Sequence, residues 1–229
     1  MIIILDTETT GFNEPEVVEM AYLEVNYPEL RVQNAFDEYY MPSKPIELGA
    51  LATHHILMSE LEGSKHSNTC KLPNNVEYVI GHNVDFDLKV LGADENLKRI
   101  DTLALSRYLV PDLDSYSQGA MMYYFMGDSA KERLKEAHNA LADVCNCREL
   151  LIQLLQVINE DNGLFPETIE HLYQLSELAR IPKVLHFGKF KGQDYKSLDQ
   201  GYVTWWLTKS DTPPDLYQRK ALTLAGFKL

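Results

Sequence analysis

The chain of 229 residues contains only three cysteines, Cys70, Cys145 and Cys147. They form neither the CxxC spacing of a zinc site nor the even set of a disulfide framework. Long apolar runs are also missing, because MIIIL at the start is followed directly by Asp6. A membrane-spanning helix needs about 20 apolar residues, so neither a membrane span nor a secretory signal core is predicted. We expect a protein of the cytoplasm, a reducing intracellular compartment, with no membrane partner.

Basic residues are few, with 21 Lys and Arg against 34 Asp and Glu, for a net charge of −13. Taken as an average, this charge argues against a nucleic-acid partner. The imbalance is uneven, however, because residues 180–229 hold nine Lys or Arg and four acids. That segment carries +5, which leaves −18 on residues 1–179 and predicts two functional pieces. An acidic body can still act on phosphodiesters when divalent cations neutralise its carboxylates.

Apolar periodicity predicts an α/β fold, a mixed sheet covered by helices. Strands are expected over 2–6, 17–25, 35–41 and 77–81 and around Ile100, and helices over 46–57, the second half of 82–93, 101–109, 115–126, 139–159 and 167–180. The polar segment 60–75 is expected to be a loop. We divide the chain into a main domain over 1–160, a helical linker over 161–182, and a small basic and aromatic module over 183–229.

Two carboxylates, Asp6 and Glu8, stand at the end of the first predicted strand. Residues i and i+2 of a strand point to the same face, so both carboxylates reach one place. Acids that close repel each other unless a cation lies between them. The local sequence leaves two interpretations open, a pair of metal ligands or two solvated acids at a strand end.

A second candidate group, HNVDFD, follows the strand at 77–81 and opens a helix. This is the usual topological place for a site in an α/β sheet. Asp85 and Asp87 would also suit a helix N-terminus, where the helix dipole favours acids. Phe86 between them fits a core anchor, and His82 fits a packed or capping residue.

The third candidate group combines His138, just before the long predicted helix, with Asp143 on the otherwise apolar face of that helix. Histidine has an ordinary pKa of about 6.5, which suits proton transfer near neutrality. Its place outside the helix would leave His138 mobile enough to enter and leave a site. A histidine beside a helix is more often structural, so that interpretation stays open.

In this order, Asp-x-Glu, His-Asn-x-x-Phe-Asp and His-x-x-x-x-Asp resemble the three exonuclease motifs of the DEDD nucleases of the histidine subtype, the DnaQ-like 3′–5′ exonucleases. The likeness spans about residues 1–159 and includes supporting positions at Thr9-Thr10-Gly11, Glu19 and Asp101-Thr102-Leu103. It implies a ribonuclease-H-like mixed sheet flanked by helices, with residues 183–229 as a small C-terminal appendage. It also implies two divalent cations, Mg²⁺ or Mn²⁺, held by Asp6, Glu8, Asp87 and Asp143, with His138 as the catalytic general base.

Two further stretches resemble the exodeoxyribonuclease X branch of that family: ALATHHI at 50–56, and HFGKFKG at 186–192 followed by GYVTWWL at 201–207. This likeness implies release of nucleotides from DNA 3′ ends, with DNA-replication or repair proteins as further partners. An RNA 3′ exonuclease of the same family stays open, because no residue reports directly on the 2′-hydroxyl. A second alternative is a non-catalytic nucleic-acid-binding module, but such a protein should have lost at least one of the five motif residues, and all five are present here. A third alternative is an unrelated acidic interaction protein, in which the match to all three motifs would be a coincidence.

Residues just past the first acids are predicted to wall a pocket for the chain end, namely Thr9, Gly11 and Phe12, together with the helix over 48–57. The family likeness places His54 near the terminal sugar, with a structural role as the equal alternative.

In the tail, lysines alternate with aromatic side chains, which offer stacking faces to unpaired bases. We expect Lys189 and Lys191, on a turn flanked by Gly188 and Gly192, to face nucleic acid. The neighbouring pair Trp205–Trp206 is expected to lie mostly in a small core.

Overall fold

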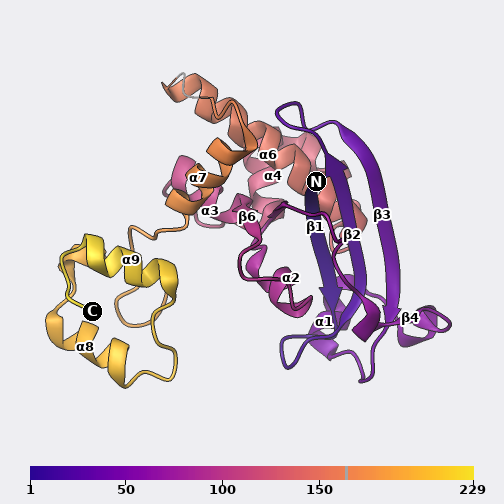
Figure 1. Ribbon diagram of the computed structural model, residues 1–229, viewed down its shortest axis with the longest axis horizontal. Helices are drawn as coiled ribbons and strands as arrows, with labels where there is room; N and C mark the ends of the chain where they lie inside the picture. Colours follow the sequence, from indigo (N-terminus) through magenta and orange to yellow (C-terminus); the bar gives the residue numbers. More distant parts are fainter. Residues whose placement is uncertain (163–164) are drawn as a thin grey trace. The chain divides into compact units, whose positions relative to one another are not determined.

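Strand β1 (Ile2–Thr9) is buried on both faces through Ile3, Ile4 and Leu5, and it forms the centre of a sheet in the computed structural model, which describes residues 1–162 and 165–229. The other strands are β2 (Val17–Val25), β3 (Val32–Met41), β4 (Lys65–His66), β5 (Tyr78–Gly81) and β6 (Lys98–Asp101). Their order across the sheet is β4-β3-β2-β1-β5-β6 (Figure 1).

The sheet is mixed, as the order of predicted elements implied. Strands β1, β2 and β3 pair antiparallel as a meander, whereas β5 and β6 extend the sheet from β1 in parallel. The carboxyl ends of β1, β5 and β6 therefore meet at one edge, where the residues that follow β5 and β6 begin helices.

The prediction of a plain loop over 60–75 is wrong in part. The segment contains the short strand β4, and 3₁₀ turns stand beside it at Met58–Leu61 and Ser67–Thr69. β4 pairs in parallel with the end of β3, and the Lys65 Nζ lies 2.6 Å from a carboxylate oxygen of Glu38. A two-residue strand has no readable periodicity, so tertiary pairing alone creates it.

The longest helix, α6 (Ala140–Asn162), covers one face of the sheet at β1 and β2 (Figure 1). Val144, Cys147, Leu151 and Leu154 form a fully buried stripe at intervals of three and four residues. Burying one such leucine stabilises a fold by about 1.5–3 kcal/mol, so this stripe fixes the helix, and with it Asp143, over the end of β1.

The remaining helices of the first part of the chain are α1 (Leu48–His54), α2 (Asp85–Val90), α3 (Thr102–Leu109), α4 (Gln118–Met126) and α5 (Ala130–Arg133). α3 and α4 pack on α6. The cluster of Ile3, Leu5, Val84 and Leu88 joins α2 to β1.

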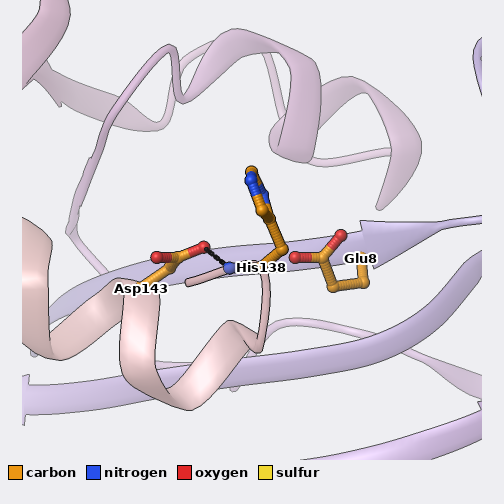
Figure 2. Close-up of side chains that lie close together, drawn as sticks. All are labelled: Glu8, His138 and Asp143. Atoms are coloured by element: carbon orange, nitrogen blue, oxygen red, sulfur yellow. Dashed lines mark hydrogen bonds between the residues drawn. The ribbon is translucent and has the colours of Figure 1, made fainter. Parts of the chain in front are cut away.

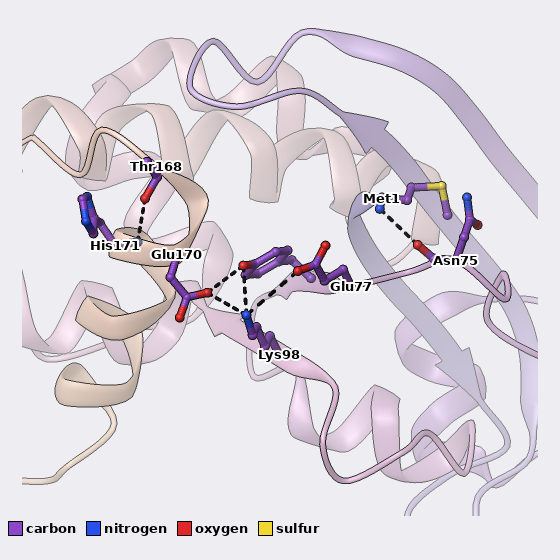
Figure 3. A network of polar contacts seen from close by, with 8 residues as sticks. Met1, Asn75, Glu77, Lys98, Thr168, Glu170 and His171 are labelled. Carbon is purple, nitrogen blue, oxygen red and sulfur yellow. Dashed lines mark hydrogen bonds and ion pairs between the residues drawn. The ribbon is translucent and has the colours of Figure 1, made fainter.

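Helix α7 (Ile169–Ala179) begins against the edge of the sheet through Glu170. Its carboxylate accepts hydrogen bonds from the Tyr78 hydroxyl and the Lys98 Nζ, both at 2.7 Å. Lys98 also lies 4.0 Å from Glu77, so its ammonium bridges two acids (Figure 3). The first turns of α7 therefore belong with the sheet.

The chain divides into two compact units, residues 1–176 and 177–229. The predicted linker over 161–182 stays a prediction, and its residues 163–164 lie outside those that the structure describes. The second unit contains α8 (Gln200–Thr208) and α9 (Leu216–Leu224) around a core of Leu185, Tyr195, Val203, Trp206 and Leu222. Within the described ranges, no helix is long and apolar enough to cross a membrane. All three cysteines are free thiols.

Candidate active site

On β1, Asp6 and Glu8 point to the same side of the sheet as Ile4. Ile3 and Leu5 point to the other side, where they pack toward α2. Both carboxylates therefore lie on the face of the sheet that α6 covers. The register between β1 and β2 shifts just after Glu8, an irregularity of the kind that re-aims side chains beside active sites. The shared face that the i, i+2 spacing predicted is present.

Asp87 reaches the same strand from α2. Its Oδ1 accepts hydrogen bonds from the backbone nitrogen and the hydroxyl of Thr7, at 3.0 and 2.6 Å. The side chain is buried. Thr7, which stands between the two acids of β1, thus fixes the third carboxylate beside them.

Asp143 lies in the first turn of α6 and is held by two donors. Its Oδ2 accepts a hydrogen bond from the His138 backbone nitrogen at 3.0 Å, and its Oδ1 accepts one from Gln118 Nε2 at 3.2 Å. Figure 2 shows Glu8 and Asp143 on either side of His138. Glu8, His138 and Asp143 each offer a ligand atom, and these atoms lie within 4.8 Å of one another.

The predicted metal residues repel one another strongly. Burial raises the pKa of Asp6 well above its ordinary value, and the charges of Asp87, Asp143 and Glu8 raise it further. Burial, followed by the charges of Asp143, Glu19 and Asp87, raises the pKa of Glu8 to about 8. Burial also raises the pKa of Asp87 to about 6, although the hydrogen bonds from Thr7 oppose the change. These shifts place all four carboxylates in one electrostatic cluster.

Glu19 on β2 has a larger part in the site than its sequence suggested. It pairs directly opposite Glu8, is 0% exposed, and accepts hydrogen bonds from Asn139 Nδ2 at 2.8 Å and Ala140 N at 3.1 Å. Asn139 also caps α6, because its Oδ1 accepts from Ala142 N at 3.1 Å. Glu19 therefore anchors the segment that carries His138. An acid inside the apolar stretch VVEMAYLEV was the one local signal for such a role.

The backbone around His138 is held by hydrogen bonds, and the mobility expected of its side chain stays a prediction. Its backbone nitrogen is tied to Asp143, the next residue is tied to Glu19, and its own φ is +69°. The left-handed backbone is costly for a residue other than glycine, and these neighbouring hydrogen bonds hold it. The imidazole is exposed, so the ring faces solvent while the backbone that carries it is held by these hydrogen bonds.

Gly11 and Phe12 follow the acids in a loop beside Glu47. Gly11 has φ of +140°, and a Cβ there would lie 2.2 Å from a carboxylate oxygen of Glu47, so glycine is required. Phe12 is 88% exposed and packs edge to face on Phe86, with ring centroids 5.8 Å apart. Phe86 is only partly buried, which corrects its interpretation as a core anchor. Thr9 is buried, and its hydroxyl donates to the Gly11 carbonyl.

His54 is buried, with both ring nitrogens engaged inside the chain. Nδ1 accepts a hydrogen bond from Ile56 N at 2.9 Å, and Nε2 lies 3.3 Å from the Thr9 carbonyl oxygen. Burial lowers the pKa of His54, which favours the neutral ring that this arrangement needs. These contacts join α1 to the end of β1 and favour the structural alternative over contact with a terminal sugar.

His82 and Asp85 of the second motif, and Asp101 of the supporting stretch at 101–103, have partners within the chain. His82 Nδ1 and Nε2 lie 3.0 Å from the Thr102 hydroxyl and 2.9 Å from the Tyr116 carbonyl oxygen, respectively. Asp85 forms an ion pair with Arg99 at 3.1 Å. Asp101 caps α3 by accepting from Leu103 N at 2.9 Å.

A family model described as an exonuclease, that of the RNase T family, matches residues 3–151. The chain belongs to this exonuclease family. The matched stretch contains all five residues of the predicted site. Membership confirms the predicted likeness to the DnaQ-like exonucleases and the predicted enzyme class, a nuclease of a family that typically uses divalent metal ions.

Solved structures share the fold of this exonuclease. Exonuclease X in complex with 5′ overhanging duplex DNA has a TM-score of 0.53 at 21% identity, over 75% of this chain and 99% of that one. E. coli Exonuclease I in its zinc-bound complex with single-stranded DNA has a TM-score of 0.56 at 15% identity, over 80% of this chain and 43% of that one. A 3′-exonuclease that recognises the histone mRNA stem-loop has a TM-score of 0.53 at 13% identity, over 68% and 81%. These likenesses confirm the predicted ribonuclease-H-like sheet.

The exonuclease also resembles a DNA polymerase III of the PolC type from Caldanaerobacter subterraneus subsp. tengcongensis. The two sequences are 24% identical over 172 residues, which is 69% of this chain. The chain spans only 12% of the length of that curated relative, so the relationship concerns one segment of a much longer protein.

In the second unit, Lys189 and Lys191 are exposed on a turn in which Gly188 and Gly192 have positive φ. The tryptophan pair is divided: Trp206 is 1% exposed, whereas Trp205 is 47% exposed. Consecutive helical residues point about 100° apart, so only one of the two can enter the core. The expectation that both are mostly core is therefore wrong for Trp205.

Proposed function

We propose that this exonuclease removes nucleotides from DNA 3′ ends by two-metal-ion hydrolysis. In this proposal Asp6, Glu8, Asp87 and Asp143 hold the ions, and His138 is the general base. The observation that carries it is the convergence of four carboxylates, with raised pKa values, beside an exposed imidazole that a hydrogen-bonded segment holds in place.

The residues fit divalent cations by their chemistry. Mg²⁺ and Mn²⁺ prefer oxygen ligands, and the cluster supplies carboxylate oxygens from β1, α2 and α6. Bound cations would favour the charged carboxylates, against the burial and the mutual repulsion that raise the pKa values of Asp6 and Glu8. When bound, such ions lower the pKa of an attacking water and stabilise the leaving oxygen.

The reaction forms one bond and breaks another. The water oxygen bonds to the terminal phosphorus, and His138 takes the proton that the water loses. The bond from phosphorus to the 3′ oxygen of the preceding nucleotide breaks, and that oxygen takes a proton from solvent. The product is a nucleoside 5′-monophosphate, and the shortened strand carries a new 3′-hydroxyl.

The loop after β1 supports cleavage at a chain end. Phe12, exposed and packed against Phe86, offers an aromatic face on which a terminal base could stack. Gly11 brings the backbone close to Glu47 and shapes that loop. Lys189 and Lys191 in the second unit are proposed to pair with phosphates of the strand.

An RNA 3′ exonuclease is the second candidate. The observation in its favour is that the 3′-exonuclease of the histone mRNA stem-loop and Exonuclease X match the fold with the same TM-score of 0.53. The likeness of the sequence to the exodeoxyribonuclease X branch favours DNA.

Digestion of matched oligonucleotides tests both candidates. Single-stranded DNA, duplex DNA and RNA of one sequence, each labelled at the 5′ end, are incubated with Mg²⁺, Mn²⁺ or chelator. We expect a ladder shortening from the 3′ end of DNA with either metal, and none with chelator or with Asp6→Ala. Labelled mononucleotide as the first product would contradict the polarity, and faster digestion of RNA would favour the second candidate.

A further inference from the structure

The second unit contains a pocket of about 510 Å³ lined by aromatic side chains. We call it the aromatic pocket and define it by Phe187, Phe190, Tyr202, Trp205 and Trp206. Its volume falls in the range of about 300–1,000 Å³ that is typical of small-ligand sites. All its lining residues come from this unit, so the pocket is complete within residues 187–212.

The rings of the aromatic pocket are fixed before any ligand arrives. Trp206 Nε1 donates a hydrogen bond to the Thr212 carbonyl at 3.0 Å, and Tyr202 stacks on the Trp206 ring at 6.0 Å. Phe187 packs edge to face on Trp206 at 5.5 Å, and Phe190 packs on Tyr202 at 4.5 Å. Aromatic pairs of this kind contribute beyond their buried area, so the walls are rigid.

Trp205 is the most exposed of the five aromatic side chains. It stands one turn along α8 from Tyr202, with ring centroids 5.8 Å apart, and it is 47% exposed. An aromatic ring that is exposed at a pocket offers a planar face to a planar ligand.

The rim of the pocket on one side is basic. A hydrogen bond from Lys191 N to the Gly188 carbonyl closes a turn, and Gly192 N and Leu185 N secure its base by bonds to Leu185 O and Gln193 O. Lys189 lines the pocket and lies 5.2 Å from the centre of the Phe190 ring. Its ammonium therefore places a positive charge at the pocket, which suits a phosphate group.

The pocket is also lined by residues that can hydrogen-bond, namely Ser210, Thr212 and Asp199. One oxygen of Asp199 already accepts from Tyr202 N at 2.8 Å as the cap of α8. Base edges carry donors and acceptors that suit these groups.

We propose that the aromatic pocket binds an unpaired nucleobase of a single strand, which stacks on Trp205 while Lys189 and Lys191 pair with flanking phosphates. This inference rests on the proposed function, because it supplies that nuclease with a second contact to its strand. The surplus of nine Lys or Arg over four acids in residues 180–229 complements phosphate, whereas the rest of the chain carries −18. A peptide without acidic residues would use the rings but would not complement this surplus.

Tryptophan fluorescence, excited at wavelengths that tyrosine does not absorb, reports on this pocket, because Trp205 and Trp206 are the only tryptophans of the chain. The full chain is titrated in chelator with a single-stranded oligonucleotide, a blunt duplex of the same sequence, and an acidic peptide of equal charge. We expect quenching by the single strand and much weaker quenching by the duplex, whose bases are paired. Equal quenching by the duplex, or quenching by the peptide alone, would overturn the proposal.

Substitutions in the aromatic pocket test which side chains contact single-stranded DNA. Trp205→Ala is expected to raise the Kd for single-stranded DNA about tenfold, the effect of losing one stacked base, and Trp205→Phe to restore most of it. Lys189→Ala should weaken binding and lower its salt dependence, whereas Leu216→Ala, at an exposed apolar residue of α9, should bind as the wild type does. An unchanged Kd in Trp205→Ala, with a wild-type melting curve, contradicts the pocket.

Hydrolysis of labelled DNA by the wild-type chain separates the two proposals. If Mg²⁺-dependent hydrolysis is present and Trp205→Ala binds DNA normally, the pocket fails while the nuclease stands. If hydrolysis is absent, the proposed function fails, and quenching by single-stranded DNA would still support the pocket as a binding site.

Discussion

The carboxylate of Glu19 accepts a hydrogen bond of 2.8 Å from the side chain of Asn139, 120 residues later in the sequence. The same carboxylate accepts from Ala140 N, so strand β2 holds the start of α6. Because His138 immediately precedes this anchored pair, the position of the exposed imidazole depends on an acid that does not face solvent.

Replacing Glu19 by alanine should therefore lower kcat about tenfold or more, with KM little changed. A hydrogen bond to a charged group is worth about 1.5–3 kcal/mol, and 1.4 kcal/mol corresponds to a factor of ten in rate. Glu19→Gln keeps one acceptor oxygen, so its kcat should lie between those of the wild type and Glu19→Ala. Steady-state kinetics on a labelled oligonucleotide measure kcat and KM separately. A fall in kcat that merely follows loss of folded protein, as judged by circular dichroism, would refute a positioning role.

His138→Ala should lower kcat by about 10²- to 10⁴-fold, the usual contribution of a general base. We expect Mn²⁺ affinity, measured by calorimetric titration, to stay near the wild-type value, because the four carboxylates remain. His171→Ala, an exposed histidine of α7, is the matched control and should retain full activity. If Mn²⁺ affinity instead collapses in His138→Ala, the ring is a metal ligand together with Glu8 and Asp143, which its distance of 4.8 Å or less would permit.

Without divalent ions the protein should lose stability as the pH rises from 6.5 to 8.5. Burial raises the pKa of Glu8 to about 8 and that of Glu19 to about 7, both above the ordinary value of 4.5. An acid whose folded pKa is raised contributes stability that is complete below the unfolded pKa and is lost as the pH passes the folded pKa. Each group can contribute at most about 1.4 kcal/mol per pH unit. Burial lowers the pKa values of His54 and His82, so these two rings add little to the change above the ordinary histidine pKa of about 6.5.

Thermal melts in chelator across this window provide the test. The melting temperature should fall with pH in the wild type, fall less in Glu8→Gln, and recover when Mg²⁺ is added. A wild-type melting temperature that rises with pH in chelator would contradict the raised pKa values.

Two glycine substitutions should have opposite effects. Gly11→Ala places a Cβ against the Glu47 carboxylate at a φ of +140°, so we expect a loss of about 1–3 kcal/mol in the free energy of unfolding and a fall in activity. Gly49→Ala, in α1, meets no atom within 4 Å and should stabilise the helix by up to about 0.5–1 kcal/mol. Urea unfolding of both variants measures the difference. Equal stability in the two would show that neither the φ of +140° nor the contact with Glu47 destabilises Gly11→Ala.

The sequence by itself indicated most of the helices and strands and named the candidate site residues. Strand β1 is visible as a run of apolar, β-favouring residues, and helix α6 is visible because its apolar residues repeat at the helix period. The spacing of Asp6 and Glu8 places both on one face of the strand. The order of the three motifs then led to the family. These features are local, so neighbouring residues carry all the information that they require.

Only the tertiary structure decided which polar residues support the site. Glu19 acts on Asn139 across 120 residues, Thr7 acts on Asp87 across 80, and His54 turns inward to Thr9. Contacts between distant segments form when the sheet and its helices pack, and no local period encodes them. The division of the tryptophan pair has the same cause. Either ring of α8 could have entered the core, and the hydrogen bond from Trp206 to Thr212 accompanies the choice that left Trp205 exposed.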